Sequence, residues 1–231
     1  AYKGGEKLGE AEIYSVGGGA IRIKGEDSVV PKDIYKLHTF TDIKNYCEEK
    51  NIRLWQYVEE VEGEDIWNYL SDIWLCMKDA INRGLNDEGI IFGGLNVQKK
   101  AKSLYNKRHI DESPETRENR LVCAYAYAVA EQNASCGTIV TAPTYGSCGI
   151  VPAVMQYVKD KRGFSDTEVL RALATGGLIG NLIKTNASIS GAECGCQAEV
   201  GGACAMAAAE LAELYGMDLN QIEYAAENSI E

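Results

Sequence analysis

Two short stretches of this sequence combine residue types that could do chemistry. The first is Thr141-Ala-Pro-Thr-Tyr-Gly-Ser-Cys-Gly149, a glycine- and hydroxyl-rich loop ahead of a predicted helix from Ile150 to Lys161. Free backbone N–H groups and the positive end of the helix dipole would gather around Ser147 to Gly149, which favours an anion such as a carboxylate or phosphate. No Gly-Lys-Ser/Thr sequence follows, so this is not a Walker loop. The structural alternative is a tight turn with an ordinary serine cap.

The second stretch is Asn186-Ala-Ser-Ile-Ser-Gly-Ala-Glu-Cys-Gly-Cys-Gln-Ala-Glu199, where small polar residues, two carboxylates and two thiols lie between two apolar segments. If Gln197 starts a helix, Cys196 and Cys204 lie ~12 Å apart along it, too far to hold one small cluster. Cys194 and Cys196 could share a face, but zinc needs four ligands, and no second Cys-x-x-Cys or histidine pair completes the set. Spacing alone therefore reveals no complete metal site. A single thiolate at a helix start would still be activated by the dipole.

Composition narrows the class of protein that positions these stretches. The 231 residues include 34 acidic and 23 basic side chains, a formal charge of −11, which disfavours nucleic acid and anionic membranes as partners. No apolar run approaches the ~20 residues of a membrane helix, and no signal segment opens the chain. The eight cysteines are then expected to be mostly free thiols in a reducing, cytoplasmic compartment. Because Ala1 is not an initiator methionine, we expect a piece of a longer protein.

The secondary-structure signals predict a mainly α protein with a short β-strand pair at its N-terminus, left over from a β-domain. Segments 12–16 and 20–24 alternate with period two around Gly17-Gly18-Gly19, which is typical of a hairpin. Residues 1–30 are interpreted as the remnant of the β-domain and its linker. Residues 31–231 are interpreted as a helical catalytic domain that is incomplete at its C-terminus.

Capping signals and helical periodicity place the main helices. We predict helices capped by Thr41 or Asp42 and running to Lys50, from Asp65 to Arg83 with Gly84 as a stop, from Ser113-Pro114 to Gln132, from Ser165 to Lys184 after a closing Gly163, and from Asp218 onward, still helical at Glu231. From Val122 on these segments are crowded with small residues, which predicts central, tightly packed helices. Glycines inside them cost ~1 kcal/mol each relative to alanine, so close packing or a nearby site must offset them; they are Gly176, Gly177, Gly180, Gly201 and Gly202.

At these residues the sequence resembles the iron–sulfur L-serine dehydratases. The stretch 186–209 resembles the cluster motif of that family, and 141–153 resembles its hydroxyl-rich loop. Gly89-Ile-Ile-Phe-Gly-Gly-Leu95 and Tyr14-Ser-Val-Gly-Gly-Gly19 resemble a further family element and the closing strand of its β-domain. The resemblance spans nearly the whole chain.

The resemblance implies a helical catalytic domain that binds a four-iron four-sulfur cluster through three cysteines and leaves one iron open to the serine hydroxyl. That iron would act as a Lewis acid, a base would remove the α-proton, and the aminoacrylate formed would hydrolyse to pyruvate and ammonia. Of the cluster cysteines only Cys196 carries over, and the other two are expected beyond Glu231. The resemblance therefore implies that this chain alone lacks the cluster and does not turn over serine. Two departures are Cys194, where the family usually has a small residue, and Ile91-Phe92 before Gly93.

The resemblance also suggests roles for the polar residues of both stretches. Ser147, Ser190 and Lys184 are the catalytic candidates, with Lys184 as general base or carboxylate partner; its alternative is a surface lysine favoured at a helix C-terminus. The candidates for binding the substrate carboxylate are Thr141, Thr144, Ser147 and Gly149, and those for the amino group and substrate positioning are Asn186, Ser188, Ser190 and Glu193. Cys136, Cys148 and Cys204 are expected to be buried packing residues.

The expected partners are L-serine, a missing β-domain or beta chain, and further copies of the chain in a homo-oligomer, with no nucleic acid and no membrane. Three alternatives remain open at this point. Two are enzymes: an L-cysteine desulfidase, and a dehydratase that prefers threonine. The third is a non-enzymatic helical protein that binds zinc or a partner through its thiols.

Overall fold

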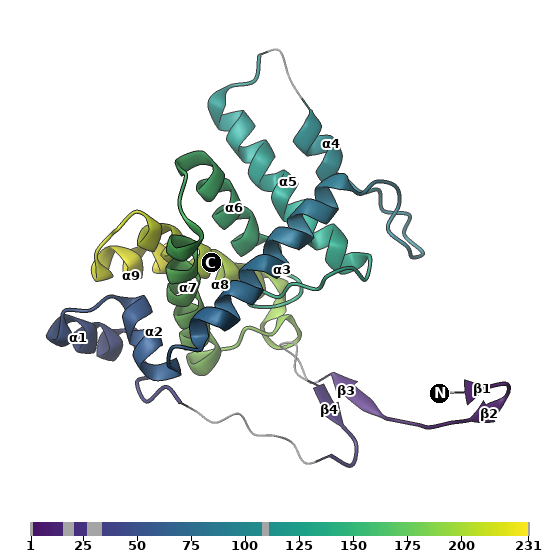
Figure 1. Cartoon of the computed structure of the whole chain (residues 1–231), viewed down its shortest axis with the longest axis horizontal. Helices are drawn as coiled ribbons and strands as arrows, with labels where there is room; N and C mark the ends of the chain where they lie inside the picture. Colours follow the sequence, from purple (N-terminus) through teal and green to yellow (C-terminus); the bar gives the residue numbers. More distant parts are fainter. Residues whose placement is uncertain (1, 16–20, 27–33, 108–110, 231) are drawn as a thin grey trace.

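A computed structural model describes residues 2–15, 21–26, 34–107 and 111–230 of the chain (Figure 1). The described part is mainly helical, as the sequence predicted. Its helices are α1 (Phe40–Lys50), α2 (Leu54–Glu62), α3 (Ile66–Asn86), α4 (Ala101–Asn106), α5 (Pro114–Ala134), α6 (Ile150–Arg162), α7 (Asp166–Asn186), α8 (Gly191–Leu214) and α9 (Leu219–Glu227). Within this part, no helix combines the length and apolar character that crossing a membrane requires.

The N-terminal segment forms strands that lie to one side of the helices (Figure 1). Strands β3 (Ile13–Ser15) and β4 (Ile21–Ile23) pair antiparallel, with Tyr14 opposite Arg22, which confirms the predicted strand pair. The glycines of the predicted turn lie outside the described residues. A second pair, β1 (Tyr2–Lys3) with β2 (Glu6–Lys7), has no strong sequence signal and was not predicted.

The core lies where α7 packs on α8 and α3 packs on α5, and glycines set the close approach of these helices. A Cβ atom on Gly180 of α7 would lie 2.7 Å from the sulfur of Met206 on α8. A Cβ atom on Gly149, at the start of α6, would lie 2.5 Å from the carbonyl oxygen of Ala126 on α5. The small-residue crowding therefore serves close packing, as expected, because larger side chains at these places would separate the helices.

Gly84 does not stop α3, contrary to the prediction. The helix continues to Asn86, and Gly84 is buried within it. A Cβ atom on Gly84 would lie 2.3 Å from the carbonyl oxygen of Ala128 on α5. This glycine is needed for a contact between helices, which a local stop signal cannot reveal.

The local capping signals gave most of the other helix ends. Ser113, Ser165 and Asp218 cap α5, α7 and α9 as predicted, and Gly163 ends α6 with φ of 76°. The predicted cap of α1 was wrong: the hydroxyl of Thr39, two residues earlier, accepts a hydrogen bond from the N–H of Asp42 at 3.1 Å. The last helix ends at Glu227 and does not continue to the end of the chain. Cys148 is buried as expected, whereas Cys136 is exposed and Cys204 only partly buried.

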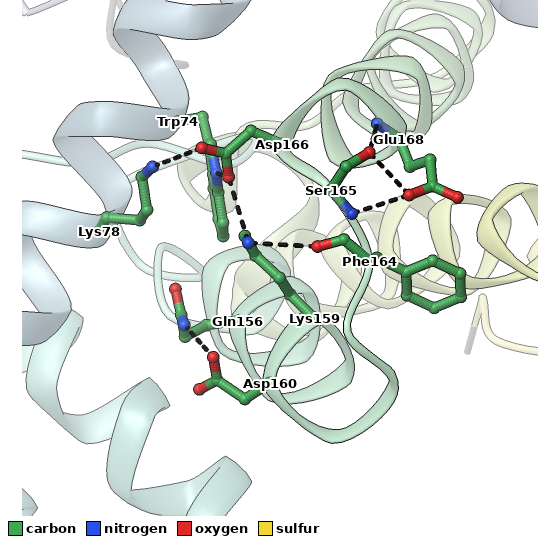
Figure 2. A network of polar contacts seen from close by, with 9 residues as sticks. All are labelled: Trp74, Lys78, Gln156, Lys159, Asp160, Phe164, Ser165, Asp166 and Glu168. Atoms are coloured by element: carbon green, nitrogen blue, oxygen red, sulfur yellow. Dashed lines mark hydrogen bonds and ion pairs between the residues drawn. The ribbon is translucent and has the colours of Figure 1, made fainter.

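A polar network joins the start of α7 to α3 and α6 (Figure 2). The indole N–H of Trp74 donates to Asp166 at 3.0 Å, and Lys78 and Lys159 approach the same carboxylate at 3.3 and 3.4 Å. The hydrogen bond from Trp74, followed by Lys78, lowers the pKa of Asp166. Because the donors come from α3 and α6, this network fixes the N-terminal end of the helix that leads to the second motif.

Candidate functional site

The two motifs, far apart in the sequence, meet at Glu199. Its carboxylate lies three residues after Cys196 on α8, and it accepts hydrogen bonds from the hydroxyl of Thr144 and from the N–H of Gly146, the latter at 3.2 Å. These contacts join positions 55 and 53 residues apart in the chain. The structure therefore brings together the hydroxyl-rich loop before α6 and the polar segment that opens α8.

The hydroxyl-rich loop is held by its own polar groups. The Thr144 and Ser147 hydroxyls lie 3.1 Å apart, and both side chains are almost completely buried, at 4 and 3% exposure. The side-chain amide of Asn133, near the end of α5, donates to the carbonyl of Val140 at 2.7 Å and accepts from its N–H at 2.9 Å. The loop therefore keeps a fixed path between α5 and α6.

The predicted carboxylate-binding residues separate into two groups. Thr141 is exposed, whereas Thr144, Ser147 and Gly149 are buried. Gly149 is the N-terminal flanking residue of α6 and has no side-chain cap. The buried hydroxyls of Thr144 and Ser147 contact each other, and that of Thr144 also donates to Glu199, so they shape the loop. Thr141 is the member of the group that solvent reaches.

The segment between α7 and α8 carries its own local hydrogen bonds. The hydroxyl of Ser188 donates to Glu193 and accepts from the N–H of Ser190 at 3.0 Å. The side-chain amide of Asn186 donates to the carbonyls of His38 at 2.7 Å and Leu182 at 3.0 Å. Ser188 and Glu193 are thus paired with each other, and Asn186 anchors the end of α7 to the segment before α1.

Lys184 lies exposed in the last turn of α7, two residues before that segment. Ser190 is buried and precedes the first residue of α8. Neither residue has a described contact with the loop at 141–149. Their predicted catalytic roles remain predictions.

The thiols of the second motif lie on either side of a break in α8. Gly195 has φ of 83° and ψ of 165°, so two helical pieces meet there, with Cys194 ending the first and Cys196 beginning the second. The expected start of a helix at Gln197 is thus displaced by one residue, and helical turns also precede it. Both thiols are exposed.

The exposed thiol of Cys196 at the start of a helical piece fits the role of a metal or cluster ligand. Within the described residues, however, no three or more histidine, cysteine or acidic side chains group as a metal site would require. A four-iron four-sulfur cluster is held by several cysteines.

Burial, with a smaller effect of Glu199, raises the pKa of the Cys148 thiol to about 11, so this nearby cysteine keeps its proton at neutral pH.

Glu199 is the site residue to which the sequence analysis gave no role. Its position three residues after Cys196 was the available signal, because residues at that spacing are neighbours on a helix surface. Gly146 and Gly191 supply a second signal only in the structure: a Cβ atom on either would lie 2.5 or 2.7 Å from Oε2 of Glu199. Glycine in both motifs therefore makes room for one carboxylate.

The chain matches the model of a protein family described as the serine dehydratase alpha chain over residues 27–231. It is 39% identical to an L-serine dehydratase of Streptomyces coelicolor over 94% of this chain and 50% of that protein. It is 38% identical to the L-serine dehydratase TdcG of Escherichia coli over 100% of this chain and 54% of that protein. A shorter match, 67% of this chain, is 46% identical to an L-serine dehydratase of Mycobacterium bovis. The chain spans about half the length of the curated relatives it matches.

Proposed function

Because the chain belongs to the serine dehydratase alpha chain family, we propose that it supplies the catalytic helical part of an L-serine dehydratase. The reaction converts L-serine to pyruvate and ammonia. The observation that carries this proposal is the similarity of at least 38% identity to curated L-serine dehydratases along 94–100% of the chain. The contact between the two motifs at Glu199 supports it, since a catalytic site requires both to lie together.

In this proposal the loop 141–149 binds the substrate carboxylate. Thr141 and the backbone amides at the start of α6 face the anion, because the positive end of the helix dipole lies there. Thr144 and Ser147 hold the loop in shape through their mutual contact, and Thr144 also donates to Glu199. Gly149 permits the close approach of this loop to α5.

Residues between Lys184 and Cys196 are proposed to act on the α-proton and the leaving hydroxyl. When bound, a four-iron four-sulfur cluster supplies a Lewis acid for the substrate hydroxyl, and Cys196 is the residue of this chain that would hold it. Lys184 takes the α-proton or pairs with the substrate carboxylate, and Ser190 and Ser188 order the segment beside Cys196. Asn186 holds the end of α7, and Glu193 is fixed by Ser188.

The strands at the N-terminus support the proposal that a β-domain or beta chain covers them. Ile13, Tyr14 and Ile21 expose 58, 49 and 65% of their surface. Two-stranded hairpins are marginally stable alone, so apolar side chains of this kind are expected to pack on further strands. We place the complete enzyme in the cytoplasm as a homo-oligomer.

The test uses the complete protein, purified without oxygen and reconstituted with iron and sulfide. We expect broad visible absorption of an iron–sulfur cluster and release of pyruvate with ammonia from L-serine. Cys196→Ser should abolish both, whereas Cys76→Ser, at an exposed thiol on α3, should retain both. Release of sulfide from cysteine as the main activity, or a colourless zinc protein without serine turnover, would contradict the proposal. A preference for threonine would appear as 2-oxobutyrate.

A further inference from the structure

Glu199 is held at one of its two carboxylate oxygens. The hydrogen bonds from the Thr144 hydroxyl and the Gly146 N–H both reach Oε1. The other oxygen, Oε2, is the atom closest to the Cβ positions of Gly146 and Gly191, at 2.5 and 2.7 Å. The side chain is therefore fixed in place while Oε2 lies between two glycines, one from each motif.

The charge of Glu199 has no counter-ion in the part of the chain that the structure describes. Each of the ion pairs found there joins other residues, including the pair between Arg53 and Glu213 farther along α8. Glu199 is also only half-buried, so part of its side chain is open to solvent. A carboxylate that is fixed in place and has no counter-ion is suited to a charge-assisted hydrogen bond from a cation.

We propose that Oε2 of Glu199 receives the α-ammonium group of the amino-acid substrate, an inference that rests on the proposed function. The ammonium and carboxylate groups of an amino acid are attached to the same carbon, so their binding groups must be adjacent. Gly146 satisfies this condition because it belongs to the proposed carboxylate loop and donates to Oε1 of Glu199. Glu199 then makes the site selective for an amino acid over the corresponding hydroxy acid.

Glu193 and Asn186, two other polar residues of the second motif, have hydrogen-bond partners outside the hydroxyl-rich loop. Glu193 accepts a hydrogen bond from Ser188 within its own segment, and both N–H groups of the Asn186 side chain are directed at carbonyls. Glu199, by contrast, is oriented by the opposite motif. Its position thus depends on the assembled site, as expected of a residue that determines specificity.

The decisive test compares two non-reacting ligands on the complete reconstituted protein. L-Alanine keeps the α-ammonium group, L-lactate carries a hydroxyl in its place, and neither has the hydroxyl that leaves from serine. Isothermal titration calorimetry with Glu199→Gln should show about tenfold to a hundredfold weaker binding of L-alanine, the range for a lost hydrogen bond to a charged group. Binding of L-lactate should be unchanged or tighter, because a negative charge beside its carboxylate is removed.

The matched control is Glu227→Gln, which removes one charge from an exposed position on α9 and should change neither affinity. Equal weakening of L-alanine and L-lactate by Glu199→Gln would overturn the proposal and leave Glu199 as a purely structural link. Gly191→Ala is a second variant, because its methyl group would lie 2.7 Å from Oε2. The Gly191→Ala variant should weaken the binding of L-alanine more than that of L-lactate. Equal weakening of the binding of both ligands would again contradict the assignment.

Failure of the proposed function is a different result. A wild-type protein that binds L-alanine but releases no pyruvate from L-serine contradicts the dehydratase activity. The ratio of the two affinities then still decides the role of Glu199. In the active enzyme, Glu199→Gln should in addition raise KM for L-serine more than it lowers kcat, since the ammonium contact is made in both the bound substrate and the transition state for removal of the α-proton.

Discussion

Two carboxylates on α8 are accommodated by glycines but meet different surroundings. Glu199 is half-buried and accepts hydrogen bonds from Thr144 and Gly146. Glu210, eleven residues later, is completely buried, and neither of its oxygens has a partner among the described residues. A Cβ atom on Gly176 of α7 would lie 2.1 Å from Oε1 of Glu210, just as one on Gly146 would collide with Glu199. Both carboxylates lie against a glycine, but of the two only Glu199 accepts hydrogen bonds from described residues.

Space and charge are separate requirements for a buried carboxylate. A glycine supplies the space, but an ionised carboxylate in an apolar interior also needs donors or a counter-ion. Glu210 has neither, and burial raises its pKa well above the ordinary value. We therefore interpret Glu210 as a neutral acid that fills the interface of α7 and α8, and Glu199 as the hydrogen-bonded link between two loops.

The largest predicted effect is a pH dependence of stability that comes from Glu210. In the unfolded chain this carboxyl ionises near its ordinary pKa of 4.5, whereas in the folded protein it keeps its proton. The folded state then binds more protons, so the free energy of unfolding falls as pH rises above the unfolded pKa, by about 1.4 kcal/mol per pH unit. Glu210→Gln should remove this slope, as measured by urea unfolding at a series of pH values above 4.5.

Tryptophan fluorescence suits this measurement, because Trp55, Trp67 and Trp74 all lie in α2 and α3 of the helical region. Glu227→Gln, with its exposed side chain, serves as the control and should retain the wild-type slope. If Glu210→Gln also retained it, Glu210 would be ionised in the folded protein, and the contrast with Glu199 would be lost.

The second prediction separates space from charge at the same interface. Gly176→Ala places a methyl group against the buried Glu210 side chain and should destabilise the protein by about 1–3 kcal/mol, the usual cost of overpacking. Gly177→Ala is the matched control, since nothing lies within 4 Å of its Cβ position. It should stabilise by about 0.5–1 kcal/mol through helix propensity alone. Thermal unfolding of the two variants side by side gives the sign of each change.

A similar effect of both alanines would mean that Glu210 moves aside at little cost. The double variant Gly176→Ala with Glu210→Gln tests this further. If the methyl group of Gly176→Ala clashes with the end of the Glu210 side chain in a rigid core, glutamine, which has the same size, should clash equally. The double variant should then be no more stable than Gly176→Ala at low pH.

Local features of the fold could be predicted from the sequence. The caps at Ser113, Ser165 and Asp218 were correct because each depends on residues within one helical turn. Gly84 was misinterpreted because a glycine is needed there for close contact with Ala128, which lies on another helix. The same limit applies to Gly176. The sequence shows that a glycine here lowers helix stability, but it does not show that Glu210 is its neighbour.

The site was predictable to the level of its two motifs and no further. The composition of 141–149 and 186–199 identified both, and the family match confirmed the resemblance. Glu199 could not be distinguished from Glu193, because both are glutamates in one polar stretch. Their hydrogen-bond donors separate them. Glu193 accepts a hydrogen bond from Ser188 within its own segment, whereas Glu199 accepts one from Thr144 in the other motif.

The smallest predicted effect concerns Asp166, an exposed carboxylate that has the donors Glu210 lacks. Trp74, Lys78 and Lys159 approach it, and these contacts lower its pKa, with the hydrogen bond from Trp74 as the largest cause. A lowered pKa in the folded protein gives stability that is present above the ordinary aspartate pKa of 3.8 and is lost as pH falls below it. This dependence has the opposite sign to that of Glu210. Because the side chain is 55% exposed, solvent screens the interaction, and Asp166→Asn should cost less than about 1 kcal/mol at pH 7.

The two pH dependences can be resolved in one series of unfolding measurements. The difference between wild type and Asp166→Asn should shrink as pH falls from about 5 to about 3, whereas the difference produced by Glu210→Gln should grow as pH rises. Asp72→Asn, at an exposed position on α3, is the control for removing one negative charge from the surface. A loss that stayed equal at pH 3 and pH 7 for Asp166→Asn would assign its role to uncharged contacts at the start of α7, such as the hydrogen bond from Trp74. In that case, the hydrogen-bond donors around Asp166 would not explain why its effect on stability depends on pH in the opposite direction to that of Glu210.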